Sequence, residues 1–157
     1  MLFSTKAEYG VRLMVELGRQ PGSQPVSLGS VAEAENLPLS YLEHLVAKLR
    51  KAGLVTSTRG AHGGYRLAKP AAEIKMDAVV EALEGQIAPM ECFHDAPEGK
   101  VLCSHESDGD SACSTKLLWM RVQGGVTKAL AGTTLAELVE FSTKSEPTRE
   151  AVLGSAA

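Results

Sequence analysis

The sequence predicts a mainly α-helical fold with one small β-hairpin. Three observations support this prediction. Apolar residues recur at helical spacing in several segments, glycine or proline follows most of these segments, and one glycine-rich stretch separates two short runs of strand-forming residues. The chain has 157 residues, 44% hydrophobic and 22% charged, which suits one globular domain or a small domain with an appended arm.

Two helices are expected near the start of the chain. The first spans residues 3–18, where apolar positions recur among charged ones before Gly18 and Pro21. The second is short and runs from a cap at Ser27 to about Glu35, after which the stretch NLPLS turns the chain.

The third helix has the clearest start signal in the chain. Ser40 and Glu43 fit a capping box, in which both side chains satisfy backbone N–H groups at the start of a helix. Apolar residues then recur at i, i+3, i+4 and i+7, so one face is expected to pack inward, namely Leu42, Leu45, Val46 and Leu49. The other side is expected to carry Tyr41, Glu43, His44, Lys48, Arg50 and Lys51, with Gly53 ending the helix.

A β-hairpin is expected directly after this helix. LVTSTRG and YRLAKP are short strand-forming runs on either side of the glycine-rich AHGG, with Arg59 and His62 at the tip. Together these elements predict a winged helix-turn-helix, whose second helix enters the DNA major groove while the hairpin reaches phosphates or the minor groove. The simpler alternative is a plain helix cap at Ser40 and a solvated turn at Arg59.

Charge is divided unevenly along the chain. Residues 1–70 hold nine Lys and Arg against five Asp and Glu, whereas residues 71–157 hold seven against fourteen, for a net charge of -3. The first part therefore suits a polyanion such as DNA, and the second would repel it. No apolar run is long enough for a membrane span, and charges in the first helix argue against a signal peptide, so we expect a cytoplasmic protein.

Two further helices are expected in the second part of the chain. MDAVVEALEG predicts a short helix ending at Gly85, and STKLLWMRVQGGVTKAL predicts a long one from about Ser114 to Leu130. The apolar residues of the long helix are expected to form one stripe, made of Leu117, Leu118, Val122, Val126 and Leu130.

A last short helix is predicted over TTLAELVEF, with Thr133 or Thr134 as its cap. The tail after it, residues 142–157, is polar and small, and we expect it to be disordered. These elements divide the chain into a winged helix-turn-helix over residues 1–70 and a region over residues 71–141 that holds a cysteine loop and the dimerisation helices.

The long helix predicts a homodimer. Its apolar stripe is more than a domain of this size easily covers, although the helix could instead pack on its own winged domain. Helix-turn-helix proteins usually read two half-sites about one DNA turn apart through a two-fold axis. We therefore expect a homodimer bound to a pseudo-palindromic operator in double-stranded DNA.

All three cysteines lie in one polar stretch, CFHDAPEGKVLCSHESDGDSAC, at Cys92, Cys103 and Cys113. In a reducing cytosol such a group indicates metal binding or redox chemistry more than structural disulfides. Thiolates at this spacing cannot form a Cys-x-x-Cys zinc knuckle, but they can surround a larger inorganic core such as an iron-sulfur cluster. Two alternatives stay open: zinc, with His94 or His105 completing the ligands, or a redox disulfide.

Four stretches carry a resemblance to a known family: MLFSTKAEYGVRLM, LSYLEHLVAKLRKAGLV, STRGAHGGYRL and the cysteine loop followed by a Leu-Leu-Trp helix. From residue 1 to about residue 141 the chain resembles the IscR-type winged-helix iron-sulfur transcription regulators, which include the nitric-oxide sensor NsrR and the iron-response regulator RirA. The resemblance implies a homodimer that binds an iron-sulfur cluster through Cys92, Cys103 and Cys113. It also carries a DNA-binding role over to Ser40, Tyr41, Glu43 and Arg59.

The chain departs from this family in two places. IscR-like members have a histidine ligand three residues after the last cysteine, and here Lys116 stands at that position. In NsrR-like members a carboxylate on the first helix takes this role across the dimer, and the matching residue is Glu8, with His105 and His94 as alternatives. The cysteine intervals are also longer than usual, so the cofactor is expected to be a [2Fe-2S] or a [4Fe-4S] cluster.

The expected DNA contacts have a physical basis. Ser40 at a helix start can offer its hydroxyl and backbone N–H groups to a phosphate, and Glu43 can accept a hydrogen bond from a cytosine amino group. Lys48 and Arg50 would add sequence-independent contacts, and Arg59 would enter the narrow groove beside the wing.

The cysteine loop and Glu8 predict a sensor and not an enzyme. Nitric oxide, iron supply, oxygen or redox potential would change the cluster, release Glu8 from it and so alter the distance between recognition helices. Nothing in the chain resembles a nucleophile with its base, a nucleotide-binding loop or a flavin site.

Overall fold

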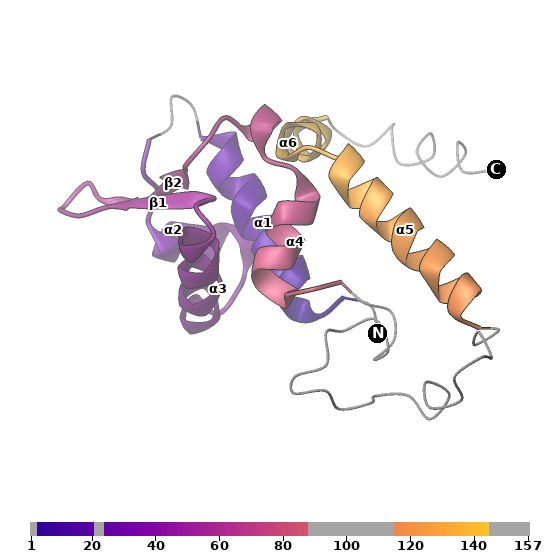
Figure 1. Cartoon of the computed structure of the whole chain (residues 1–157). Coiled ribbons are helices and arrows are strands. Elements are labelled where there is room, and N and C mark those ends of the chain that lie inside the picture. The colour runs from indigo at the N-terminus through magenta and orange to yellow at the C-terminus, as the bar shows by residue number, and fades with distance from the viewer. Residues whose placement is uncertain (1–2, 21–23, 88–114, 145–157) are drawn as a thin grey trace.

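The computed structural model describes residues 3–20, 24–87 and 115–144. Within them the chain is mainly helical and has one two-stranded antiparallel hairpin, as predicted (Figure 1). The elements, in order, are α1 Thr5–Arg19, α2 Leu28–Glu35, α3 Leu39–Lys51, β1 Val55–Thr58, β2 Gly64–Leu67, the 3-10 helix η2 Ala71–Glu73, α4 Met76–Glu84, α5 Lys116–Gly132 and α6 Leu135–Thr143. No helix in these ranges is long and apolar enough to cross a membrane.

α1 lies at the centre of the fold and packs against α3, α4 and α6 (Figure 1). It continues one residue past Gly18, where the sequence predicted its end. Gly18 does not end the helix but allows close packing, because a Cβ at this position would lie 2.7 Å from Val139 of α6. Gly10 lets α4 approach in the same way, since a Cβ there would lie 2.2 Å from Leu83. Both glycines therefore serve helix packing.

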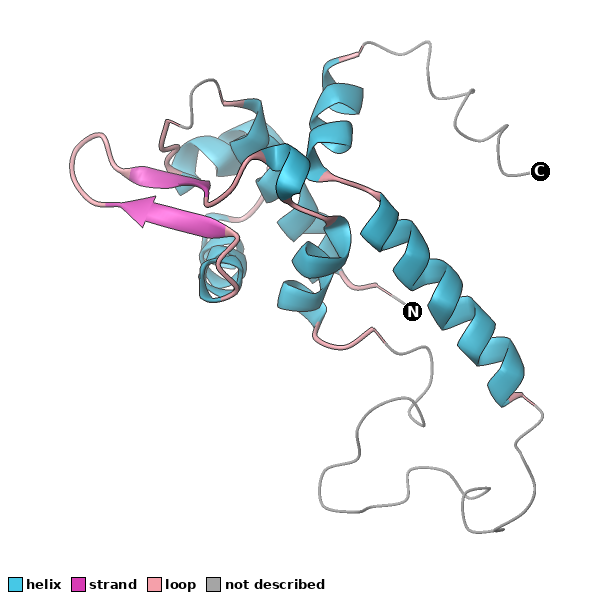
Figure 2. Cartoon of the chain, turned by 45° about the horizontal axis from the view of Figure 1, so that its top comes forward, coloured by secondary structure: helices cyan, strands magenta, loops and turns pink. Residues whose placement is uncertain are grey.

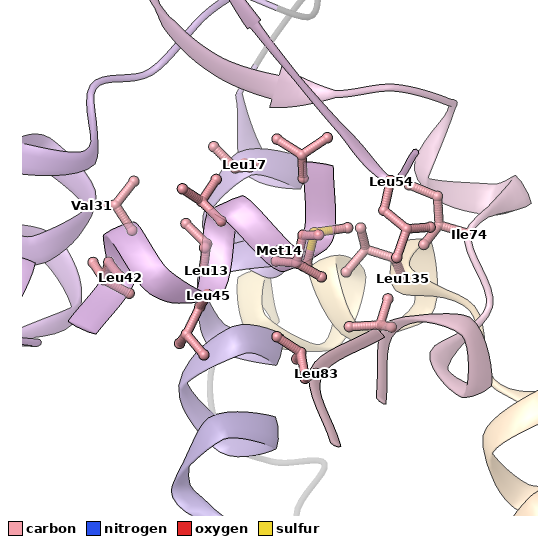
Figure 3. Packing of buried hydrophobic residues seen from close by; sticks show 14 of the residues in the cluster. Leu13, Met14, Leu17, Val31, Leu42, Leu45, Leu54, Ile74, Leu83 and Leu135 are labelled. Carbon is pink, nitrogen blue, oxygen red and sulfur yellow. The ribbon is translucent and has the colours of Figure 1, made fainter. Parts of the chain in front are cut away.

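One apolar core joins the two predicted parts of the chain. Side chains from α1, α3, α4 and α6 meet in it, and burying one of them fully contributes about 1.5–3 kcal/mol. The core continues across the predicted boundary at residue 70. Figure 3 shows many of its members, and the fully buried ones include Leu13, Met14, Leu42, Leu45, Ile74, Leu83 and Leu135.

The start of α6 is fixed beside the segment that precedes α4. The Leu135 N–H donates to the Ile74 carbonyl at 2.8 Å. α6 begins with a capping box, in which the side chains of Thr134 and Glu137 accept from each other's backbone N–H groups. Of the two threonines predicted as the cap, Thr134 is the one that fills this position.

The predicted tail begins too early. α6 includes residues 142 and 143. The Ser142 hydroxyl donates to the Val139 carbonyl at 2.7 Å and accepts from Arg19 Nε at 3.2 Å, so this turn is bonded both to its own helix and to α1. Residues 145–157, the rest of the predicted tail, lie outside the described residues.

α5 differs from the other α-helices of the described ranges because it has no buried residue. Figure 2 shows it extending away from the rest of the fold. The predicted apolar stripe is covered over only part of its length: Val122, Val126 and Leu130 are half-buried, whereas Leu117 and Leu118 are 58% and 55% exposed. Successive residues turn by about 100° around a helix, which puts Leu117 on a different side of α5 from Leu130.

Candidate DNA-binding and sensing sites

The connection between α2 and α3 is a tight turn that is anchored in the core. Ser27 caps α2 as predicted, accepting from the backbone N–H of Ser30 at 3.0 Å. Asn36 ends α2 in the left-handed region, with φ 51°, and its backbone N–H returns to carbonyls of the last turn. Leu37 is buried, and α3 packs against α2. This is the geometry of a helix-turn-helix.

The capping box predicted at Ser40 is wrong. α3 begins at Leu39, before the expected cap, and Pro38 precedes it without a side-chain cap. Pro38 itself is extended, with φ −63° and ψ 123°, as is usual for the residue that precedes a helix. The Pro38 carbonyl accepts from the N–H groups of Tyr41 and Leu42, both at 3.1 Å. Ser40 therefore lies inside the first turn, where it is exposed.

One face of α3 is exposed along its whole length. It holds residues spaced by three or four positions, which are Ser40, Glu43, His44, Ala47 and Lys51. The opposite face is buried as predicted and holds Leu42, Leu45, Val46 and Leu49. The sequence prediction placed His44 and Lys51 among the outward residues but not among the DNA contacts, and their spacing from Ser40 is the signal that assigns them to the same face.

Three predicted DNA contacts have partners within the protein. Lys48 Nζ donates to the Leu83 carbonyl at 2.9 Å, in the last turn of α4. Arg50 Nη1 donates to a serine hydroxyl on β1 at 3.4 Å. Tyr41 is half-buried, and its ring meets the ring of Tyr9 edge-on with 5.7 Å between centroids. These side chains therefore lie on the flanks of α3 and connect it to α4, the hairpin and α1.

The hairpin is held firmly and carries charge at its tip. Tyr65 and Val26 exchange two backbone hydrogen bonds of 2.8 Å, which join β2 to the segment before α2. Gly64, with φ 152°, is required at this contact because a Cβ would lie 2.4 Å from the Val26 carbonyl oxygen. Arg59 and His62, predicted at the tip, are exposed there.

Glu8, the predicted fourth ligand, lies in the first turn of α1 with an exposed side chain. It lines a mainly apolar groove of about 480 Å³ where α1, α4 and α5 meet. The other lining residues include Phe3, Ala7, Val11, Val80 and Leu130. The groove is open, so the carboxylate is accessible to a group that another chain brings to it.

A second carboxylate holds this end of α1 in place. Glu84 Oε1 accepts from the Ser4 N–H at 2.9 Å, from Ser4 Oγ at 2.5 Å and from the Ala7 N–H at 3.3 Å. Burial raises the pKa of Glu84, but these hydrogen bonds and the nearby Lys6 charge outweigh it and leave the pKa below its ordinary value. The last turn of α4 thus binds α1 through Glu84 and α3 through the Leu83 carbonyl.

The cysteines Cys92, Cys103 and Cys113 lie outside the described residues, as do His94 and His105. Among the residues that the structure does describe, no group of three or more His, Cys, Asp or Glu could hold a metal ion. Lys116 is exposed as the first residue of α5. The ligand set of three cysteines and Glu8 therefore stays a prediction.

Comparison with known proteins assigns the chain to a family. The family model for Rrf2, described as an iron-dependent transcriptional regulator, matches residues 3–141. The chain belongs to the Rrf2 family. The resemblance to IscR-type regulators is thereby confirmed, since relatives of this Rrf2 chain include proteins named IscR. Because the relatives are named as transcriptional regulators, this Rrf2 protein is a transcriptional regulator and not an enzyme.

Individual relatives cover most of the Rrf2 chain. CymR of Bacillus subtilis is 38% identical over 142 residues, which cover 90% of this chain and 92% of CymR. IscR of Vibrio vulnificus is 36% identical over 139 residues, covering 88% of this chain and 77% of that protein.

Solved structures of Rrf2 proteins confirm the winged-helix fold. The structure of CymR, the global cysteine regulator of B. subtilis, matches with a TM-score of 0.73 and 38% identity. The match covers 90% of this chain and 98% of CymR. The structure of T. potens IscR matches with a TM-score of 0.72 and 35% identity, over 93% of this chain and 91% of that one.

Proposed function

We propose that this Rrf2 protein is a homodimeric regulator that binds a pseudo-palindromic operator and senses redox potential, nitric oxide or iron through an iron-sulfur cluster. One observation carries the DNA-binding part of the proposal. α3 and the hairpin lie side by side, on the side of the fold away from α5, and each has an exposed polar surface (Figure 1, Figure 2). In this role the protein works in the cytoplasm, on double-stranded DNA.

α3 enters the major groove with its exposed face. Ser40 offers its hydroxyl and the backbone N–H groups of the helix start to a phosphate. Glu43, about one turn further along the same face, accepts from a cytosine amino group. Arg59 on the hairpin reaches the adjacent narrow groove. Lys48 and Arg50, on the two flanks of α3, add positive charge near the DNA backbone.

Substitution of Glu43 tests whether α3 reads bases. Glu43→Ala should reduce discrimination at one base-pair position by about 1–3 kcal/mol, whereas Arg59→Ala should weaken binding to all operators and reduce its salt dependence. Fluorescence anisotropy with an operator and its single-base variants, at several salt concentrations, measures both effects. Glu81→Ala, which removes an exposed carboxylate of α4 outside this face, is the control and should leave both properties unchanged. An equal loss on every operator for Glu43→Ala would contradict base reading.

The proposed dimer forms through α5. Leu117, Leu118 and Met120 are each more than half exposed in the single chain. A helix that packs loosely on its own domain and exposes apolar side chains gains stability when another surface covers them. A two-fold axis through this surface also gives the two recognition helices that two DNA half-sites require.

The proposed cofactor is a [2Fe-2S] or [4Fe-4S] cluster held by Cys92, Cys103 and Cys113, with Glu8 of a second copy as the fourth ligand. Thiolates are the usual ligands of iron-sulfur iron. When bound, the cluster supplies a centre that reacts with oxidants and nitric oxide. The exposed Glu8 carboxylate beside an open groove fits the role of a ligand that is easily released.

Contacts around α4 supply a route from Glu8 to the DNA-binding helix. Glu8 lies in the first turn of α1, and Glu84 at the end of α4 binds the start of that helix. The neighbouring Leu83 carbonyl accepts from Lys48 of α3. Release of Glu8 from the cluster would let the start of α1 shift and would change, through this turn, how α3 is held.

Spectroscopy on purified protein tests the cofactor and its fourth ligand. We expect anaerobically purified protein to show iron-sulfur absorption and EPR signals, with matching iron and sulfide content. Glu8→Ala should alter these signals, speed cluster loss and reduce the ratio of holo to apo DNA affinity. Glu33→Ala, an exposed carboxylate on α2, is the control. Unchanged signals and an unchanged affinity ratio in Glu8→Ala would remove Glu8 from the ligand set.

The alternative is an Rrf2 regulator whose cysteines bind zinc or form a redox disulfide. A solved structure of Staphylococcus aureus CymR in an oxidized form, 39% identical to this chain, favours this alternative. His94 or His105 would complete a zinc site. Colour separates the two proposals, because zinc protein is colourless. Colourless, iron-free protein that contains zinc or a reversible disulfide would replace the cluster and leave the DNA-binding proposal intact.

A further inference from the structure

The tip of the β-hairpin is a tight turn with a defined shape. It follows the last paired residues of the two strands, Thr58 of β1 and Gly64 of β2. The Gly63 N–H donates to the Gly60 carbonyl at 2.9 Å and closes a four-residue turn. A Cβ at Gly63 would lie 2.3 Å from the Thr58 carbonyl oxygen, so only glycine allows the chain to close here. The turn therefore holds its other residues in fixed places.

His62 is the outermost polar side chain of this tip. Arg59 lies one residue beyond the last strand pair, whereas His62 lies two residues beyond it. The neighbours of His62 at the end of the turn, Gly60 and Ala61, have no side chain that can form a hydrogen bond. His62 is exposed, and within the described part of the chain no hydrogen bond or ion pair holds its imidazole. A surface that meets the end of the hairpin therefore meets this imidazole.

The surface that the tip would meet on DNA is the minor groove. The hairpin extends beyond the helices, next to α3 (Figure 1). When α3 occupies the major groove, the hairpin reaches the adjoining minor groove. A·T pairs present only hydrogen-bond acceptors there, adenine N3 and thymine O2, whereas a G·C pair adds the amino group of guanine N2. An imidazole N–H can donate to these acceptors but would meet a second donor at guanine.

We propose that His62 reads the minor groove and makes the protein prefer an A·T pair at the position that the hairpin tip reaches. The inference rests on the proposed DNA-binding mode and adds to it a specificity-determining residue and the base pair that it selects. The negative potential of a narrow, A·T-rich groove attracts histidine and favours an imidazole that turns an N–H toward the bases. Because the side chain is short and the turn is tight, the donor reaches one position.

Selection of binding sites from a randomised double-stranded DNA library gives the first measurement. The probe protein is the full-length chain, both as purified without air and after removal of any bound metal. Unmodified protein should enrich half-sites with an A·T pair outside the bases whose selection depends on Glu43. His62→Ala should enrich the same half-sites without a preference at that pair. If both proteins enriched the same A·T pair, another residue would read it and the inference would fail.

Inosine in the selected site assigns the preference to one groove. An I·C pair lacks the guanine N2 amino group, so it resembles an A·T pair in the minor groove and a G·C pair in the major groove. Replacing the A·T pair by G·C should weaken binding of unmodified protein about fivefold or more, and I·C should restore it. His62→Ala should bind all three sites alike. An I·C site that binds as weakly as the G·C site would place the reading outside the minor groove and overturn the inference.

Two further variants separate direct reading from recognition of groove width. A·T-rich DNA also has a narrower groove, which an arginine can recognise without a base contact. We expect Arg59→Ala to weaken binding to all three sites evenly and to keep the A·T preference. The reverse result, a preference lost in Arg59→Ala and kept in His62→Ala, would assign it to groove width. Arg66→Ala, which removes an exposed charge from β2 outside the tip, is the control and should keep the preference.

The same measurements separate failure of the inference from failure of the proposed DNA-binding mode. If unmodified protein enriched no site in either form, both would fall. If it enriched half-sites without any base preference at the hairpin position, only the role of His62 would fall. His62→Ala should keep the melting temperature of unmodified protein, because His62 is exposed in a turn that two glycines close. His62→Gln, which keeps a side-chain N–H donor, should retain part of the A·T preference.

Discussion

The helices around α1 and the separate helix α5 differ in what covers their apolar residues. Leu13 of α1, Leu42 of α3, Leu83 of α4 and Leu135 of α6 are fully buried within one chain. α5 is the longest helix in the described ranges, with 17 residues, and buries none of them. The helices around α1 therefore bury their apolar residues within one chain, whereas α5 leaves apolar residues that the proposed second copy would cover. The two regions should respond to different perturbations.

The largest effect is expected from a cavity among the helices around α1. Leu45→Ala should lower the free energy of unfolding by about 2–5 kcal/mol, because Leu45 is only 2% exposed and its loss leaves a void. This loss should not depend on protein concentration, since the core lies within one chain. Denaturant titrations at two concentrations measure both properties. Leu39→Ala, 44% exposed in the same helix, is the control and should cost far less.

Charges on α5 should produce the opposite pattern. The double variant Leu117→Glu, Leu118→Glu should weaken the dimer by several kcal/mol, about 2–4, because it places carboxylates in the proposed interface. The free energy of unfolding of the helices around α1 should change by less than about 0.5 kcal/mol, as for other surface substitutions. Light scattering after size exclusion and thermal melts measure the two effects. A dimer that persists in this variant at micromolar concentration joins through another surface.

The same contrast explains how much of the fold could be predicted. The helices around α1 and the hairpin follow from local patterns, such as the i, i+3, i+4 and i+7 apolar series of α3 and the glycines of the hairpin. The apolar pattern of α5 mixes two groups of residues. Some, such as Val126, are half-buried against the chain's own fold, and others, such as Leu118, are left exposed. Periodicity records that a residue is apolar, but not which chain covers it.

At the candidate site, patterns among neighbouring residues failed to predict two features. These are the start of α3 and the contacts made by residues that lie far apart in the chain. The Ser40 and Glu43 motif predicted a cap, but α3 begins at Leu39, and the Pro38 carbonyl accepts the first hydrogen bonds of the helix. Glu84 gave no signal, because the Ser4 groups that it binds are 80 residues away in the chain. The proposed ligand role of Glu8 depends on a second chain, which no local pattern encodes.

Glu84 provides a smaller, pH-dependent test of how the helices around α1 are held together. Its pKa is lowered in the folded state, so the charged carboxylate stabilises the fold above its ordinary value of 4.5, and this contribution is lost as the pH falls through the lower, folded-state pKa. Glu84→Gln should remove about 0.5–2 kcal/mol at neutral pH, as the loss of a helix cap does, and less at about pH 3. Urea titrations at both pH values measure this difference.

The matched control for that experiment is Glu81→Gln, which changes an exposed carboxylate of the same helix. It should have little effect at either pH. If Glu84→Gln lost the same stability at both pH values, the charge of Glu84 would not be what binds the start of α1.

The smallest effects come from comparing the starts of α6 and α3. Thr134 forms a capping box with Glu137, whereas Ser40 caps nothing. Thr134→Ala should therefore cost about 1 kcal/mol of unfolding free energy, and Ser40→Ala should change it by less than about 0.5 kcal/mol. DNA affinity should follow the reverse order, since a lost phosphate contact at Ser40 weakens binding to every operator. If Ser40→Ala lost stability but kept its DNA affinity, Ser40 would be a structural residue outside the DNA interface.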